Sequence, residues 1–111
     1  MAGKFVITKG KDNKFYFNLK ASNGQVILTS QGYKDKKGCL NGIDSVKRNS
    51  KDGDRFEVKT SSNDKEYFVL NATNGQVIGK SQMYKSGGGC SVGIKSVANN
   101  VDGAKVADES E

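Results

Sequence analysis

The chain has 111 residues, of which 34% are hydrophobic and 27% charged, a composition typical of one globular domain. It has no apolar run of signal-peptide or membrane-spanning length, so we expect a cytoplasmic protein with no membrane partner. Histidine is absent, which excludes Ser/His/Asp and Cys/His catalytic sites and removes the commonest metal ligand. We therefore expect no enzyme activity, no metal and no cofactor.

The net charge of +6 is unevenly distributed along the chain. Residues 1–51 carry 11 Lys or Arg and 3 acidic residues, whereas residues 52–111 carry 7 and 9. A basic first half is compatible with binding of nucleic acid or another polyanion, and it also occurs on ordinary solvated surfaces. The charge alone does not identify a partner.

A block of sequence occurs twice, and the two copies are offset by 51 residues without a gap. The first reads NGQVI from Asn23, then SQxY, GC and GIxSV, and the second reads the same from Asn74. Such a match indicates a duplicated unit. Each unit alone would bury too little surface, so we expect one domain over 1–111 in which repeat one (4–51) and repeat two (55–102) share a core. This predicts a monomer with an internal pseudo-dimer.

The first part of each repeat alternates as β-strands do. We expect strands at 5–9 and 14–21, joined by a turn. Apolar positions that both repeats keep on one face predict the core: Phe17, Leu19, Phe68 and Leu70. The opposite face is expected to stay open, with Val6, Thr8, Tyr16, Asn18, Lys20 and Tyr67 on it.

Each repeat continues with Asn-Gly, at 23–24 and 74–75, between strand-like runs. This pair favours a type I′ hairpin turn, which needs positive φ at both central residues. The recurrence of Asn-Gly is therefore explained by the backbone, and no ligand is needed to account for it. Third strands are expected at 25–30 and 76–80.

The apolar period then becomes helical in both repeats. The two predicted stripes are Cys39, Ile43 and Val46, and Cys90, Ile94, Val97 and Val101. Asp35 and Ser86 are the expected N-caps. Gly42 and Gly93 lie beside the stripes, where glycine costs helix stability, and a close approach of helix to sheet would explain them.

The segment after each helix completes the pattern. Residues 55–60 match the first strand of repeat one and also follow a helix, so we expect a strand shared between the repeats. Residues 104–107 are a weaker candidate for the same post-helix strand, and 108–111 are expected to form a frayed acidic tail. The prediction is an α+β fold of two tandem βββα(β) repeats, with one mainly antiparallel sheet of about six strands and two helices on one face.

The combination NGQVIxxSQxY and GCxxGIxSV, in two copies, resembles the YegP-like family of small uncharacterised bacterial proteins over nearly the whole chain. The resemblance implies that β3αβ units, as tandem repeats or as two chains of a dimer, complete one sheet by exchanging the last strand. It implies no activity, substrate or catalytic residue. The chain departs from the family's usual Glu-Asn pair, with Leu40-Asn41 and Ser91-Val92 there, and has three glycines at 87–89.

Two candidate sites lie at the first helix start and on the open sheet face. The helix start has lysines beside the positive end of the helix dipole, a conflict that a bound phosphate would relieve. That candidate anion site comprises Lys34, Lys36, Lys37 and Gly38; alternatively the lysines simply point into water. The sheet face offers Tyr16, Tyr67 and Lys20 for stacking on nucleic-acid bases, or as ordinary surface pairs.

A third candidate is the polar set that both repeats share: Ser30, Gln31, Tyr33, Ser81, Gln82 and Tyr84. These residues form either two equivalent pockets or hydrogen-bonding corners of the fold. Cys39 and Cys90 lie on the apolar stripes and are expected in the core, although a helix N-terminus can activate a thiol.

These observations predict a non-enzymatic binding or interaction module whose ligand and partner are unknown. One alternative is binding of nucleic acid or another polyanion through the basic first repeat. The other is a structural or protein-partner role.

Overall fold

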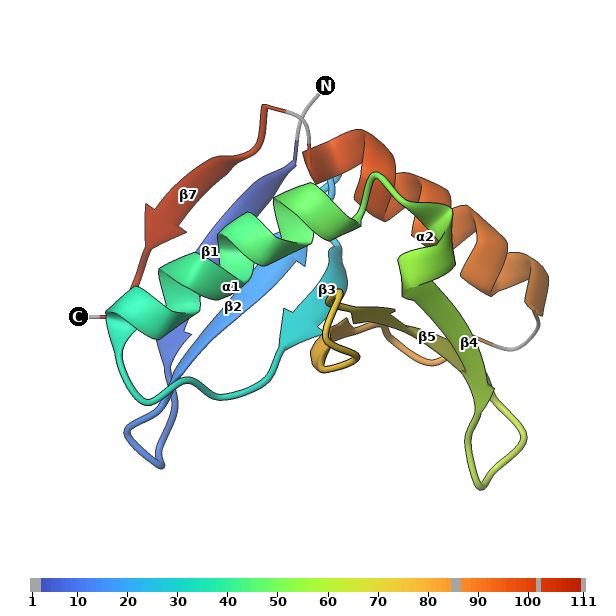
Figure 1. Cartoon of the computed structure of the whole chain (residues 1–111), viewed down its shortest axis with the longest axis horizontal. Helices are drawn as coiled ribbons and strands as arrows, with labels where there is room; N and C mark the ends of the chain where they lie inside the picture. The colour runs from blue at the N-terminus through green and yellow to red at the C-terminus, as the bar shows by residue number, and fades with distance from the viewer. Residues whose placement is uncertain (1–2, 85–86, 102, 111) are drawn as a thin grey trace.

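In the computed structural model, which describes residues 3–84, 87–101 and 103–110, the chain forms one β-sheet with two helices on the same face (Figure 1). This is the predicted α+β arrangement. Along the chain the elements are β1 (Lys4–Lys9), β2 (Phe15–Lys20), β3 (Val26–Ser30), α1 (Lys36–Asn49), a 3-10 turn (Gly53–Arg55), β4 (Phe56–Thr60), β5 (Glu66–Asn71), β6 (Val77–Lys80), α2 (Gly87–Val101) and β7 (Lys105–Asp108).

The sheet order is β4-β5-β6-β3-β2-β1-β7. Each repeat contributes three consecutive antiparallel strands, and the two sets meet at the antiparallel pair of β3 and β6. Helix α1 contacts β2 of its own repeat and β5 and β6 of the other, and α2 likewise contacts strands of both. The repeats therefore share one core, as the sequence predicts.

Strand β7 makes the sheet seven-stranded, where about six were expected. After α2 the chain crosses to the outer edge of β1, and β7 runs parallel to β1 there (Figure 1, left). Strand β4, predicted to be shared between the repeats, pairs only with β5 among the described strands and ends the sheet. The exchange is thus made by β7, because β4 already serves as the first strand of repeat two.

The prediction of a frayed tail at 108–111 is wrong for Asp108 and Glu109. Asp108 is the last residue of β7, and the Glu109 N–H donates to the Ile7 carbonyl at 2.8 Å. Asp108 also pairs with Lys36 of α1 at 2.7 Å. The edge of β1 and a lysine of α1 supply partners that local sequence does not reveal; Glu111 lies outside the described residues.

The Asn-Gly turns are hairpin turns of a different type from the one predicted. In each of these turns only the glycine has a positive φ, 87° at Gly24 and 85° at Gly75. A type I′ turn needs a positive φ at both central residues. The Gly24 N–H donates to the Ala21 carbonyl at 2.9 Å. This is a type I turn followed by a left-handed glycine, the usual three-residue hairpin loop. Asn23 Oδ1 accepts from Gln25 N at 3.0 Å and braces the loop.

The predicted core residues of β2 and β5 are fully buried: Phe17, Leu19, Phe68 and Leu70. Both helical stripes pack against them, with only Ile94 left partly exposed. On the other face, Val6 is 2% exposed although an open position was expected. It lies between Asn18 of β2 and Ala107 of β7, and this second neighbour exists only because β7 joins the sheet.

The predicted N-cap of α1 is confirmed. The Asp35 side chain caps α1 by accepting from Gly38 N at 2.7 Å. Ser86, the other expected N-cap, lies outside the described residues. Helix α2 nevertheless extends over 15 residues despite its glycines.

The junction between the repeats is asymmetric in its packing at Leu28. Leu28 is fully buried, and its counterpart in repeat two is Gly79. A Cβ on Gly79 would lie 2.7 Å from Leu28 Cγ. One leucine therefore fills the space near the pseudo-twofold axis, and glycine is required opposite it.

Ser50, directly after α1, is buried, yet its Oγ has no hydrogen-bond partner in the described structure. Its counterpart Val101 packs in the core. Ser50→Val replaces an unsatisfied hydroxyl by apolar atoms, so we expect the free energy of unfolding to rise by about 1 kcal/mol. Urea unfolding measures this change, and an unchanged or lower midpoint would contradict it.

Candidate functional site

Ser30 and Ser81 of the shared polar set are hydrogen-bonded within the fold. Ser30 Oγ accepts from Phe17 N at 2.9 Å and donates to the Gln31 carbonyl at 2.8 Å. Ser81 makes the same two bonds to Phe68 N and the Gln82 carbonyl. Both serines are buried, and each ends the ladder between its second and third strands.

The two glutamines bridge the repeats. Gln31 Nε2 donates to the Val77 carbonyl, and Gln82 Nε2 donates to the Val26 carbonyl. Both pairs of Ser-Gln residues line a single cavity of about 280 Å³ over β3 and β6. The structure thus brings Ser30, Gln31, Ser81 and Gln82 together around one cavity. The functional hypothesis from the sequence was two separate, equivalent pockets.

The tyrosines of the set lie elsewhere, under the helices. Tyr33 stacks on Phe17, with ring centroids 6.1 Å apart, and its hydroxyl faces Gly42 of α1. A Cβ on Gly42 would lie 2.7 Å from Tyr33 Cζ, and Tyr84 has the same relation to Gly93. Burial raises the pKa of both tyrosines. The predicted close approach of helix to sheet is therefore confirmed, with a tyrosine ring between them.

This contact predicts that Gly42→Ala destabilises the fold. The variant gains helix propensity of about 1 kcal/mol, but its methyl group overlaps the Tyr33 ring, and we expect a net loss of about 1–3 kcal/mol. Gly53→Ala is the matched control, because nothing lies within 4 Å of a Cβ there. Chemical unfolding of both variants provides the comparison. Equal stability of the two would mean that the ring moves aside without cost.

The candidate anion site at the start of α1 is occupied by the protein's own carboxylates. Asp35 accepts from Gly38 N, and Lys36 Nζ lies 2.7 Å from Asp108 Oδ2. Lys34 and Lys37 are exposed. The conflict between lysines and the helix dipole is thus relieved within the chain, and no external anion is needed to explain it.

The ion pair at this helix start makes stability depend on acid pH. Lys36, with Ser110, holds the pKa of Asp108 at about 2, below its ordinary value of 3.8. A lowered folded-state pKa contributes stability above about pH 4 that is lost as the pH falls toward 2. Asp108→Asn should therefore lose less stability over this window than the parent chain. Urea midpoints at several pH values test this, with Glu109→Gln as the control; parallel curves for parent and Asp108→Asn would contradict it.

The candidate sheet-face residues do not form a common platform. Tyr16 on β2 and Tyr67 on β5 have β3 and β6 between them. Tyr16 OH donates to Asp12 Oδ2 at 2.6 Å, and Lys80 Nζ lies 4.7 Å from the Tyr67 ring centroid. Lys20 is half-buried at the other end of β2 from Tyr16. The tyrosines neither cover one another nor share a stacking surface.

The thiols are core residues, as predicted. Cys39 and Cys90 are fully buried, and burial raises the pKa of Cys39 to about 11 and that of Cys90 in the same direction. Thiols held protonated are poor nucleophiles. Within the described residues, no cluster of three or more Cys, Asp or Glu side chains could hold a metal ion. No helix of the described chain is long and apolar enough to cross a membrane.

One polar groove was missed by sequence reasoning. It lies between α1 and the β5–β6 hairpin and has a volume of about 440 Å³. We call it the arginine groove; it is lined by Ser45, Arg48, Asn49, Asp52, Arg55, Ala72, Thr73 and Asn74. An adjoining cavity of about 520 Å³, which shares four of these residues, extends it past Asn41 to Tyr33 and Gln31.

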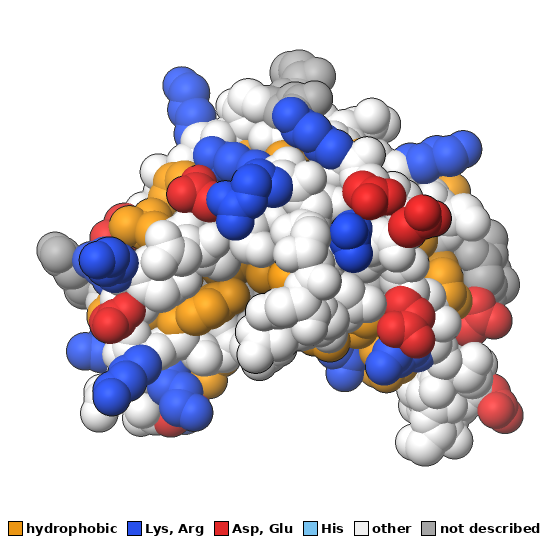
Figure 2. Space-filling model, viewed as in Figure 1, with side chains coloured by type: hydrophobic (Ala, Val, Ile, Leu, Met, Phe, Trp, Pro, Cys, Tyr) orange, Lys and Arg blue, Asp and Glu red, His pale blue; other side chains and the backbone are white. Residues whose placement is uncertain are grey.

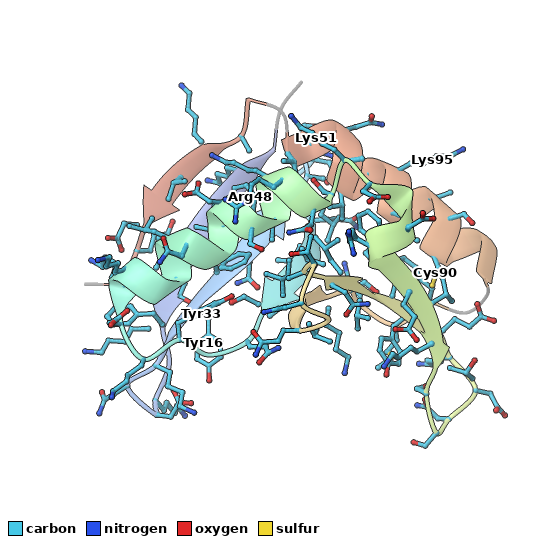
Figure 3. The ribbon with its side chains drawn as sticks, viewed as in Figure 1. Tyr16, Tyr33, Arg48, Lys51, Cys90 and Lys95 are labelled. Carbon is cyan, nitrogen blue, oxygen red and sulfur yellow. The ribbon has the colours of Figure 1, made fainter. Side chains whose placement is uncertain are left out.

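Both arginines of the chain line this groove. Arg48 projects from α1, above Tyr33, in Figure 3, and Figure 2 shows basic side chains gathered over this helix. Arg55 pairs with Asp52 at 3.5 Å, whereas the Arg48 side chain has no ion pair or hydrogen bond within the described structure. One guanidinium is therefore available to a ligand.

The groove also contains an acceptor without a donor. Asn49 is 8% exposed, and its Nδ2 donates to the Ser45 carbonyl and Oγ, but no described group donates to its Oδ1. The counterpart Asn100 makes the same bonds to Ser96, and its Oδ1 also accepts from Ser22 N at 3.1 Å. The two helices thus differ. A backbone N–H of the β2–β3 hairpin donates to Asn100 of α2, whereas no described N–H of the β5–β6 hairpin donates to Asn49 of α1.

Comparisons with known proteins place this fold in a family. The description "Domain of unknown function (DUF1508)" matches residues 11–57 and 61–108. The chain belongs to the DUF1508 family. A UPF0339 protein of Pseudomonas aeruginosa is 50% identical over 99% of this chain and 100% of its own length. The UPF0339 protein YegP of Escherichia coli is 48% identical over 97% and 98%.

Two solved structures of DUF1508 relatives have the same fold. The solution NMR structure of YegP from E. coli matches with a TM-score of 0.94 at 47% identity, covering 99% of this chain and 95% of that one. The UPF0339 protein of Shewanella oneidensis matches with a TM-score of 0.92 at 44% identity, covering 99% and 93%. The predicted resemblance is confirmed, and these relatives are themselves described as proteins of unknown function or by family number alone.

Proposed function

We propose that this protein is a non-enzymatic binding module and that its ligand, a small molecule with a carboxylate or phosphate group, binds in the arginine groove. The observation that carries the proposal is the unpaired guanidinium of Arg48 in a groove that also holds the chain's other arginine. A guanidinium binds carboxylate and phosphate oxygens in a planar two-point contact, which favours these anions over other ligands.

The rest of the groove fits the same chemistry. Among the described residues that line it, the only acidic side chain is Asp52, which already pairs with Arg55. The free Asn49 Oδ1 accepts a hydrogen bond, so a ligand with a hydroxyl or amino group beside its anion would satisfy both groups. Neutral side chains of Ser45 and Asn74 offer further hydrogen bonds without repelling an anion.

The absence of a catalytic arrangement supports a binding role over catalysis. The two thiols are buried with raised pKa values, and the groove's described side chains provide no general base next to a nucleophile. Repeat two has Asn99 where repeat one has Arg48, so we assign the ligand to repeat one alone.

Amide NMR shifts in the labelled protein test this site, with inorganic phosphate and glycerol 3-phosphate as probes. Glycerol 3-phosphate adds hydroxyl donors to the same anion, and we expect it to bind more tightly and to shift the amides of residues 45–49 and 73–74. Arg48→Asn removes the guanidinium and introduces the residue found at the equivalent position of repeat two, Asn99. We expect this variant to weaken binding about tenfold or more.

Lys95→Asn is the matched control, since it removes one exposed cation from α2, away from the groove. Equal weakening by both variants, or no local shifts at millimolar probe, would contradict the site. A single-stranded oligonucleotide serves as a further probe for the polyanion alternative, which the basic first repeat favours. Salt-sensitive oligonucleotide binding that is unaffected by Arg48→Asn would support that alternative instead.

A further inference from the structure

The two edges of the sheet are built alike but completed differently. Strands β1 and β4 occupy equivalent places, with Phe5 paired to Leu19 and Phe56 paired to Leu70. The neighbouring ring pairs agree closely: Phe5–Phe17 at 5.8 Å and 71°, and Phe56–Phe68 at 5.7 Å and 71°. Yet β7 lies along β1, while β4 has no strand beyond it in the described sheet.

The missing neighbour leaves apolar surface uncovered. Ile7 of β1 is 1% exposed, whereas its counterpart Val58 is 49% exposed. Phe56 is likewise only partly buried, although Phe5 is fully buried. Figure 1 shows β4 at the right-hand edge of the sheet, at the opposite end from β7.

The connectivity explains why the described chain does not fill this edge. The segment that follows α2 becomes β7 and pairs with β1. The segment that follows α1 is β4 itself, which the tandem arrangement uses as the first strand of repeat two. Pseudo-symmetry therefore calls for an eighth strand, and the seven described strands leave none to supply it.

We propose that the outer edge of β4 binds an extended peptide segment of another protein, running parallel to β4 as β7 runs parallel to β1. Backbone hydrogen bonds would provide affinity, and alternating side chains would provide specificity, as in other cases of strand addition. This proposal concerns a different surface from the arginine groove and does not depend on it.

The β7 register defines the side chains that such a peptide needs. Val106 and Asp108 of β7 lie opposite Phe5 and Ile7, and Ala107 lies opposite Val6. Lys36, the partner of Asp108, has the glycine at 87 as its repeat counterpart, so this ion pair has no equivalent on the β4 side. Opposite Val58 an apolar residue is favoured, and opposite Glu57 a lysine or arginine.

A synthetic peptide based on β7 tests this design. Its sequence is that of residues 103–110 with Ala107→Lys and Asp108→Val, namely Gly-Ala-Lys-Val-Lys-Val-Glu-Ser. Added to the full-length labelled protein, it should shift the amides of residues 55–60. A control peptide is N-methylated at the glutamate, because the Glu109 N–H is the donor to the Ile7 carbonyl in the intramolecular pair. It should bind far more weakly.

Val58→Lys should weaken the peptide about tenfold, since it removes the apolar surface that the peptide would cover. Leu40→Lys is the matched control; Leu40 is 43% exposed but lies on α1. Shifts confined to β1 would mean that the peptide displaces β7, and no shifts at millimolar peptide would mean that the edge is closed. Either result overturns the proposal, as would concentration-dependent shifts of β4 without peptide, which would identify a second copy as the occupant.

Discussion

The fold depends on the short junction between β3 and β6. Only two residue pairs join these strands, Thr29–Lys80 and Ser30–Gly79, so the backbone ladder alone is a weak link between the halves. The cross-repeat bonds of Gln31 and Gln82 reinforce it, and each helix packs over strands of both repeats. Neither repeat has a complete core without the other, so the protein should unfold as one cooperative unit.

The residues of the duplicated motif form this scaffold. Serine ends the ladder between the second and third strands, glutamine joins the repeats, tyrosine separates helix from sheet, and glycine makes room for the tyrosine ring. Residues that both repeats retain are thus the ones that packing and hydrogen bonding already explain. The candidate binding features are instead found where the repeats differ, at Arg48 and Arg55 and at the outer edge of β4.

Local sequence predicted what local interactions determine: the equivalent core residues Phe17 and Phe68, the two helices and the Asp35 cap. It also indicated a weak strand at 104–107, where β7 forms, but it did not predict the pairing with β1, because a four-residue strand becomes stable only through the edge that it meets. The burial of Val6 follows from the same event. The arginine groove was not visible either, since it forms between α1 and a hairpin distant in sequence. The replacement of Arg48 by Asn99 in repeat two was the available signal.

The parallel pairing of β1 and β7 also determines how the molecule would respond to tension. The first and last strands lie side by side and point the same way, so a force that separates the start of β1 from the end of β7 acts along the strands. Their evenly spaced hydrogen bonds would then be loaded in shear together, and not peeled apart one after another. The four-residue β7 would thus act as a mechanical clamp that shields the repeat junction from the pull.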